Sequence, residues 1–261
     1  NIAADGTHTN GLFGVEGSMT YTHSNLFGGA ERLRVSLSGG LEMQRLVFAS
    51  DSSATFGSEV SPVNELANTF NTAEFGPKLS LTFPKLLFIQ SPLEKLLKSR
   101  LSNPQTEISA SVNYQRRPDF KRGIEEFSFG WIYHETAPIT IRFYPVIVSA
   151  IAIQKSIEFE NRINELNDRF LAASYQDHII AGGKISFAHN GQNDRKVKNT
   201  FYFQSTLETA GNLLRGVHNM LDIPYANDSL QSYNLFNIRF AQFIKISGDL
   251  RYYQPVFQRS K

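Results

Sequence analysis

The segment 31–44 alternates between apolar and polar residues, and this constrains the fold more than any other feature of the chain. The apolar phase consists of Leu33, Val35, Leu37, Gly39, Leu41 and Met43. The polar phase begins with Arg32 and Arg34 and ends with Glu42. Successive side chains of a strand point to opposite faces, so the segment predicts a strand with one apolar and one charged face. Strands in globular proteins usually have about 5–6 residues. A strand of twice that length with these two faces is typical of a wall between lipid and water.

The same alternation recurs along the chain and predicts about ten strands. The expected strands cover residues 1–9, 12–23, 31–44, 75–83, 108–114, 127–133, 139–144, 179–189, 199–212 and 232–256. Asn10-Gly11 is a strong two-residue hairpin signal. Pro145 removes a ladder donor within an apolar run, so we expect a bulge there. The polar stretch Ser50–Asn71 predicts a long loop.

Two other segments follow the helical period. Ser91, Pro92 and Glu94 fit an N-cap, a first-turn proline and a capping-box residue. The leucines at 93, 96, 97 and 101 then share one helical face. A second stripe, spaced 4, 3 and 4 residues apart, consists of Phe159, Ile163, Leu166 and Phe170. We expect this second helix to pack over the mouth of a barrel, while a partner-binding or membrane-surface role stays open.

Composition excludes several classes of protein. Of the 261 residues, 41% are hydrophobic and 19% are charged, which argues against disorder. The longest nearly unbroken apolar run, 144–153, is about half of the ~20 residues that a spanning helix needs. A helical membrane protein is therefore excluded, whereas a barrel is compatible because its strands are only half apolar. The net charge of +2 gives no reason to expect a nucleic-acid partner.

The position of the charges favours a membrane barrel over a soluble antiparallel sandwich, which would also alternate. The charged residues that share the polar phase are Arg32, Arg34, Glu42, Lys78, Glu107, Arg142, Lys184, Glu208, Lys245, Asp249 and Arg251. A lipid-facing Arg or Lys near the midplane costs about 2–4 kcal/mol. A one-residue slip of the 31–44 strand would expose Arg32, Arg34 and Glu42 together, so charge fixes the register as well as burial.

No residue pattern predicts an enzyme. The six His residues show no pair at metal-ligand spacing. The chain has neither a Gly-x-Ser-x-Gly nucleophile motif nor a phosphate-binding loop. It contains no cysteine, which excludes disulfides and thiolate metal sites. We therefore expect no catalytic residues, no metal and no cofactor.

Several local sequences, taken in order, resemble one family. The segment 21–31 contains Asn25, Leu26, Phe27, Gly28, Gly29, Ala30 and Glu31, and it resembles the connection between the second and third strands of BamA/TamA-type outer-membrane insertases, the bacterial surface antigen family. Pro84-Lys85 resembles their turn after the fourth strand, where Pro-Arg is commoner. The segments 114–120, 174–182 and 251–255 resemble later parts of the same barrel in the same order.

The resemblance implies an all-β fold, a transmembrane antiparallel β-barrel present here as a partial barrel of ten strands with short loop helices. In the family a sixteen-strand barrel follows periplasmic POTRA domains. Residues 1–261 would be the N-terminal part of that barrel, without the POTRA domains, the last six strands and the family's lumen loop motif. We accordingly interpret the chain as a fragment. We expect an open, curved sheet in which the first and last strands do not pair with each other.

The resemblance also implies a function in outer-membrane protein insertion, assembly or translocation by strand addition at a lateral seam. The implied seam residues are Ile2, Ala3, Ala4, Asp5 and Gly6. The residues expected to face the lumen are Arg32, Arg34, Glu42, Arg142, Lys245, Asp249 and Arg251. The implied location is the outer membrane of a Gram-negative bacterium. The implied partners are the lipid bilayer, nascent outer-membrane proteins, and periplasmic or lipoprotein assembly factors. A passive outer-membrane channel or a surface-receptor barrel remains the alternative.

Overall fold

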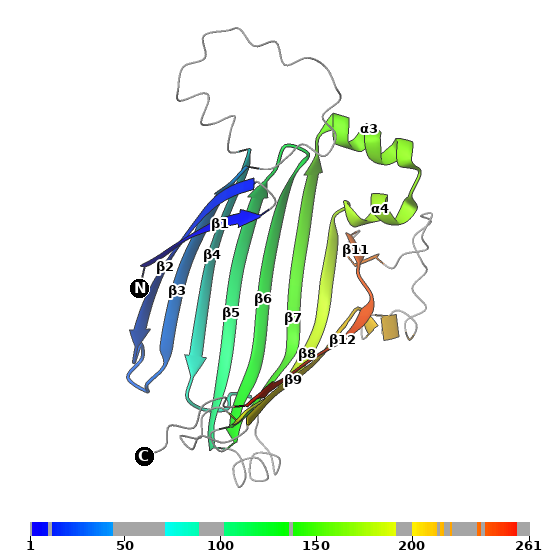
Figure 1. Ribbon diagram of the computed structural model, residues 1–261. Coiled ribbons are helices and arrows are strands. Elements are labelled where there is room, and N and C mark those ends of the chain that lie inside the picture. Colours follow the sequence, from blue (N-terminus) through cyan, green and yellow to red (C-terminus); the bar gives the residue numbers. More distant parts are fainter. Residues whose placement is uncertain are drawn as a thin grey trace.

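The computed structural model shows one curved, nearly all-antiparallel β-sheet with two short helices at one end (Figure 1). The structure describes residues 2–9, 12–43, 71–88, 102–135, 138–191, 200–212, 215–216, 220, 234–235 and 238–254. The predicted all-β fold is confirmed. Asn10-Gly11, the loop residues 50–70 and the helix expected at 91–101 lie outside the described residues.

The strands follow one another around the sheet in chain order for most of its width. Their bounds are β1 (Ile2–Thr9), β2 (Leu12–Ser24), β3 (Arg32–Glu42), β4 (Thr72–Phe83), β5 (Ser102–Arg116), β6 (Phe120–Glu135), β7 (Ile139–Lys155), β8 (His178–Asn190), β9 (Thr200–Ala210), β10 (Asn234–Leu235), β11 (Ile238–Phe240) and β12 (Phe243–Tyr253). These strands form because apolar and polar side chains alternate, which gives each long strand one apolar and one polar face. Pairing with neighbouring strands satisfies the hydrogen-bonding groups of the backbone.

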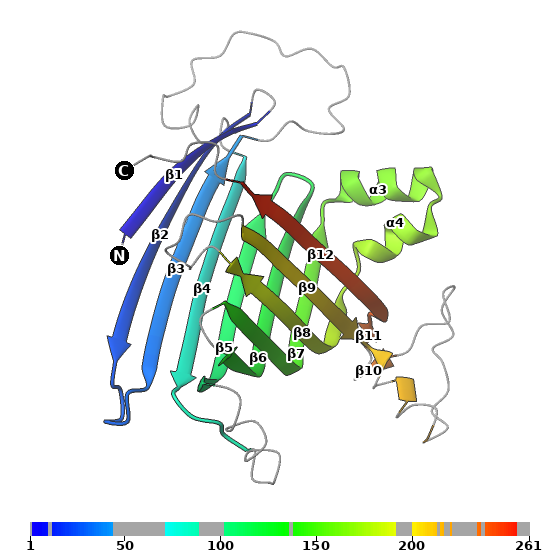
Figure 2. The same cartoon turned by 60° about the horizontal axis from the view of Figure 1, so that its bottom comes forward.

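The sheet is open. β1 pairs only with β2, and β12 pairs only with β9. Among the described residues no ladder joins β1 to β12, as predicted. Figure 2 shows the sheet as a trough in which β8, β9 and β12 turn across in front of the wall formed by β2 to β7. The architecture is barrel-like, with two strand edges left at its sides.

β5, β6 and β7 form the longest part of the sheet, with 15, 16 and 17 residues. The bulge predicted at Pro145 is confirmed. The β7–β8 register shifts between the Tyr144 and Ile147 pairs, and the β6–β7 register shifts between the Phe129 and Trp131 pairs. Because Pro145 lacks an N–H group, the chain bulges there and then continues to Lys155.

The last strand, predicted to run unbroken over 232–256, is instead divided into β10, β11 and β12. β9 ends at Ala210, opposite Gly182, so it leaves the start of β8 without a neighbour. β11 fills this position by pairing parallel with His178 and Ile179. Gly211, with φ 71°, lies where the chain crosses, and a Cβ there would collide with the Ala241 carbonyl. This close crossing separates β11 from β12.

The prediction of a single helix over the stripe 159–170 is also wrong in part. Two helices form, α3 (Ile157–Leu166) and α4 (Arg169–Ser174), separated by Asn167 in the left-handed conformation. The Ser156 hydroxyl caps α3, and the Asp168 carboxylate caps α4 by accepting from the N–H groups of the next turn. Because the axis breaks at Asn167, the four-residue stripe cannot form one continuous buried face.

Only the first half of that stripe packs against the sheet. Phe159 and Ile163 are buried and form a cluster with Phe120. Tyr175 closes the cluster, with its ring centroid 4.9 Å from that of Phe159. Leu166 and Phe170 remain 56% and 79% exposed. This apolar cluster holds the helices beside the start of β6 and the end of β7. Figure 1 shows the two helices at its upper right.

Candidate functional site

β1 lies at one side of the described sheet. Its register with β2 runs from Thr9 opposite Leu12 to Ile2 opposite Met19. Among the described residues, the other side of β1 has no strand neighbour. The implied seam residues Ile2, Ala3, Ala4, Asp5 and Gly6 all lie in β1.

Register places the predicted lumen-facing residues on a single face of the sheet. One row of paired residues crosses β3 to β6 and consists of Arg34, Ser80, Ser109 and Ser128. A second row crosses β7, β8, β9 and β12 and consists of Arg142, Ser186, Thr206 and Ser247. Arg32, Glu42, Lys245, Asp249 and Arg251 alternate with apolar residues in the same phase as these rows. The term "polar face" is used below for this side of the sheet.

The polar face holds a groove of about 360 Å³ across β4 to β9. The Tyr144 hydroxyl donates to Glu107 at 3.1 Å, reaching from β7 to β5 across Gly130 of β6. A Cβ at Gly130 would collide with the Tyr144 ring, so the glycine leaves room for this contact. The Ser149 hydroxyl donates to Glu126 at 3.2 Å. Hydrogen bonds between strands thus line a concave, charged surface.

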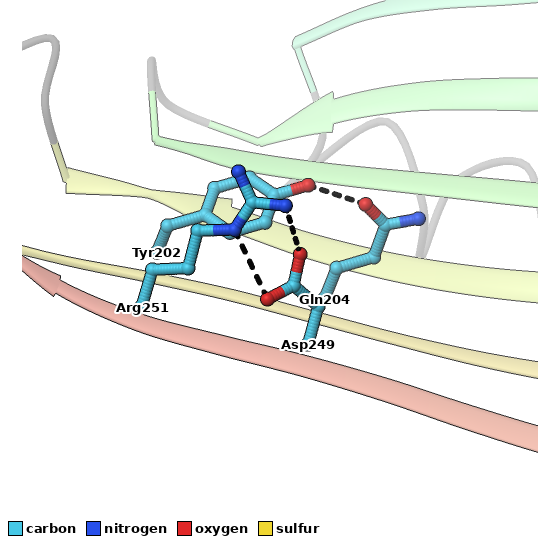
Figure 3. A network of polar contacts seen from close by, with 4 residues as sticks. All are labelled: Tyr202, Gln204, Asp249 and Arg251. Carbon is cyan, nitrogen blue, oxygen red and sulfur yellow. Dashed lines mark hydrogen bonds and ion pairs between the residues drawn. The ribbon is translucent and has the colours of Figure 1, made fainter. Parts of the chain in front are cut away.

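The last strands add charges of both signs to the same face. Lys184, Glu208 and Lys245 stand in register on β8, β9 and β12. Figure 3 shows the neighbouring network, where the Arg251 guanidinium pairs with Asp249 at 2.6 Å and lies over the Tyr202 ring at 5.7 Å. The Tyr202 hydroxyl donates to Gln204. The polar face therefore suits water or a polar chain better than lipid.

The opposite side, called the outward face below, is apolar and exposed. Its exposed large side chains include Val15, Met19, Leu37, Leu79, Phe127, Val148, Ile185, Leu207, Ile246 and Leu250. Such a wide apolar surface is unusual for a protein surrounded by water. Among the described residues no helix is long and apolar enough to cross a membrane.

Aromatic side chains gather on the outward face near the connections that follow β4, β6 and β8. Trp131 stacks on Phe143 with ring centroids 5.8 Å apart, and Phe129 lies between Trp131 and Phe88. His189 stacks on Phe201 at 4.5 Å, and its register places it on the outward face. Aromatic rings near one end of the strands resemble the aromatic girdles at membrane interfaces.

The prediction that charges stay in the polar phase fails at Glu125. Its register partners are Val112 and Ala150, and it shares the outward phase with Phe127. Lys121 lies on the same side, nearer the start of β6. The strands β5 to β7 are longer than the ~9–11 residues that cross a bilayer, so their end beside the helices has room for charge beyond an apolar band.

The turn between β2 and β3, residues 25–31, is held by side chains. Asn25, Gly28 and Ala30 have positive φ angles of 78°, 89° and 62°. The Ala30 N–H donates to the Asn25 side chain at 2.9 Å. The Glu31 carboxylate accepts from the Gly29 N–H at 3.0 Å and the Phe27 N–H at 3.3 Å. The motif is therefore explained by local folding alone, without a ligand.

Glu31 is buried within this turn, with 7% of its surface exposed. Its pKa lies below the ordinary value because backbone N–H groups, first its own and then those of Gly29 and Phe27, donate to the carboxylate. Burial opposes this effect but does not cancel it. The ionised carboxylate therefore helps hold the turn.

A second turn, 84–88, is fixed by a residue that sequence reasoning missed. Thr106 is fully buried, its hydroxyl donates to the Lys85 carbonyl at 2.7 Å, and it accepts from the Leu87 N–H at 2.9 Å. The Trp131 indole N–H donates to the Leu87 carbonyl at 3.1 Å. The sequence signal was a threonine in the outward phase. Its hydrogen-bond partners are evident only in the structure.

The structure brings the predicted site residues into three separate places. The seam residues occupy the β1 edge, the turn motif caps β2 and β3, and the charged set lies on the polar face. Among the described residues no group of three or more His, Asp or Glu side chains is arranged to hold a metal ion. Comparison with family models, curated proteins and solved structures gave no match for this chain. The resemblance stated above therefore stays a prediction.

Proposed function

We propose that this protein acts in the outer membrane as a factor for protein insertion and assembly, and that it works by strand addition at β1. The outward face would meet lipid and the polar face would line an aqueous lumen. The β1 edge would pair with strands of nascent outer-membrane proteins. The seam is formed by Ile2, Ala3, Ala4, Asp5 and Gly6.

The open edge of β1 is the observation that supports the proposal. Among the described residues, one side of the β1 backbone has no strand neighbour. A backbone group without a partner in lipid costs several kcal/mol, so an incoming strand that pairs there gains stability regardless of its sequence.

A passive channel or a surface-receptor barrel is the second candidate, and the polar groove favours it. The network of Glu107, Tyr144, Glu126 and Ser149 crosses several strands and requires no free edge. This reading predicts that β1 pairs permanently with another strand of the same protein. The two candidates therefore differ in what contacts β1 while the protein is at work.

Site-specific photo-crosslinking separates them. A photo-crosslinking amino acid placed at Ile2 or Ala4 of the intact protein, during active secretion, is expected to capture nascent outer-membrane proteins. The matched control is Leu37, an outward residue two strands away from the edge, which is expected to capture mainly lipid.

Crosslinks from Ile2 and Ala4 that reach only the protein's own last strand would favour the passive barrel. Crosslinks from Leu37 that reach soluble proteins instead of lipid would overturn the membrane placement itself. The two failures are thus distinguishable in one experiment.

A further inference from the structure

The outward face has a groove of about 500 Å³ where β7, β8 and β9 meet. Its walls are Phe143 and Val148 on one side and Ile185 and Leu207 on the other, and Ala181 and Gly183 form its floor. The lining is almost entirely apolar. The alternating sequence pattern does not predict this groove, because its lining residues come from three strands.

The bulge at Pro145 creates this groove. The β7–β8 register shifts between Tyr144 and Ile147, which brings the bulged chain close to Gly183. A Cβ at Gly183 would lie 3.1 Å from the Tyr144 carbonyl oxygen, and one at Gly182 would collide with the Thr209 carbonyl. The floor is therefore low in side chains because the backbones approach too closely to admit them.

The chemistry of the groove suits a hydrocarbon chain and not a peptide. The strands around it are already paired with one another, so no sheet edge is free to bind a peptide backbone. An acyl chain needs no hydrogen bonds and gains from contact with the apolar walls, at about 0.8 kcal/mol per buried CH₂ group. The groove is also continuous with the outward face, which under the proposed function already lies in lipid.

One end of the groove is polar, and the backbone of Arg215 lies close to it. Thr209, Gly211 and Asn212 line this end. Arg215 follows one turn later, and its backbone N–H donates to the Gly211 carbonyl at 2.8 Å. The Arg215 side chain is exposed. An arginine side chain that begins here is long enough to reach a phosphate at this end of the groove, and its N–H groups can donate to two phosphate oxygens.

We propose that this groove binds one acyl chain of an anionic phospholipid, whose phosphate lies within reach of Arg215. The inference rests on the proposed membrane location and adds a specific lipid site to it. The site lies away from the β1 edge, so it does not take part in strand addition. Its expected role is to hold one anionic lipid against the bulge of β7.

The only tryptophan of the chain provides the measurement. Trp131 stacks on Phe143, which lines the groove, so a bromine atom on an acyl chain in the groove would quench its fluorescence. The intact protein is reconstituted in unlabelled phosphatidylcholine vesicles. These carry a minor fraction of either brominated phosphatidylglycerol or brominated phosphatidylcholine. We expect about fivefold enrichment of the anionic lipid near Trp131, the factor that one cation near a membrane surface contributes.

Two variants and one control test the site. Ala181→Phe fills the floor, and Arg215→Gln removes the cation from an exposed position; both are expected to abolish the preference for brominated phosphatidylglycerol. Leu37→Phe changes an outward residue outside the groove and is expected to keep it. If Ala181→Phe does not assemble, Arg215→Gln decides the test, because an exposed side chain is seldom needed for folding.

The outcomes separate this inference from the proposed function. Equal quenching by the two brominated lipids in the wild type, or an unchanged preference in Arg215→Gln, would show only ordinary boundary lipid and overturn the site. Vesicles made wholly of brominated phosphatidylcholine should quench Trp131 in every variant. No quenching in those vesicles would mean that Trp131 does not face lipid, and the membrane placement itself would be wrong.

Discussion

The wall β5–β7 and the edge β1 are built from the same alternating pattern, yet they differ in what holds them. β6 has 16 residues and is paired on both sides, and side chains such as Ser109 and Ser128 add a 2.8 Å hydrogen bond beneath the ladder. β1 has one neighbour among the described residues. Since each pairing stabilises a strand from one side only, the same kind of sequence gives a rigid wall in the middle of the sheet and a replaceable strand at its edge.

Hydrogen exchange should show the largest difference between the two regions. Backbone amides of β1 are expected to exchange about a hundredfold or more faster than those in the middle of β6, because edge strands open locally while central strands open only with the whole sheet. Amide exchange followed by mass spectrometry on the protein in detergent measures this. Equal protection of β1 and β6 would mean that a further strand covers β1 at rest, and the edge would not be available.

A charge placed on the outward face should give the next largest effect. It tests the assignment of an outward and a polar face, which the wall and the edge share. Leu37→Arg places a charge on the outward face, at an expected cost of about 2–4 kcal/mol, and should block assembly in membranes. Ser36→Arg changes the neighbouring residue on the polar face and should be tolerated. Membrane insertion of the two variants is compared by protease protection. Equal assembly would remove the assignment of the two faces.

A buried hydroxyl in the wall should matter more than an exposed one near the edge. Thr106→Val removes the contacts to Lys85 and Leu87 and is expected to cost about 1–3 kcal/mol. The matched change Thr22→Val affects an exposed threonine of β2 and is expected to stay within about 0.5 kcal/mol. Urea unfolding of both variants gives the comparison. Similar losses would show that the wall owes its stability to pairing alone.

The smallest expected effect is a pH dependence confined to the turn beside the edge. Because the pKa of Glu31 is lowered in the folded chain, its ionised form stabilises the turn above the ordinary value of 4.5, and this is lost as the pH falls through the lowered value. Protection of the Phe27 and Gly29 amides, expressed relative to the intrinsic exchange rate at each pH, should therefore fall in acid. Glu31→Gln should show low protection at every pH, and an unchanged acid response in that variant would assign the effect to another group.

Much of the sheet could be predicted from alternation alone. Strands β2, β3 and β8 begin and end within one or two residues of the predicted bounds, because charge and burial fix the same register. The bulge at Pro145 followed from the missing N–H group. The wall strands were predicted too short. β5 runs from Ser102 to Arg116, and β6 begins at Phe120 and continues through Glu125, a charge that interrupts the expected phase.

The candidate site divides in the same way. The residues of the turn 25–31 and the charged phase of the strands were evident from local sequence. The hydrogen bond between Tyr144 and Glu107, the capping role of Thr106 and the outward groove were not. Each of these depends on residues that are brought together across strands by register shifts, which no local pattern contains.

The sequence by itself determined that the chain forms long strands with one apolar and one polar face, because a period of two assigns every side chain to a side. It also determined the turn at Asn25–Glu31, where short-range hydrogen bonds suffice. Only the tertiary structure decided that the strand expected over 232–256 divides into β10, β11 and β12, and that β11 pairs parallel with the start of β8. Those outcomes depend on which distant backbones meet, and the free energy of such long-range pairing is not encoded in any one segment.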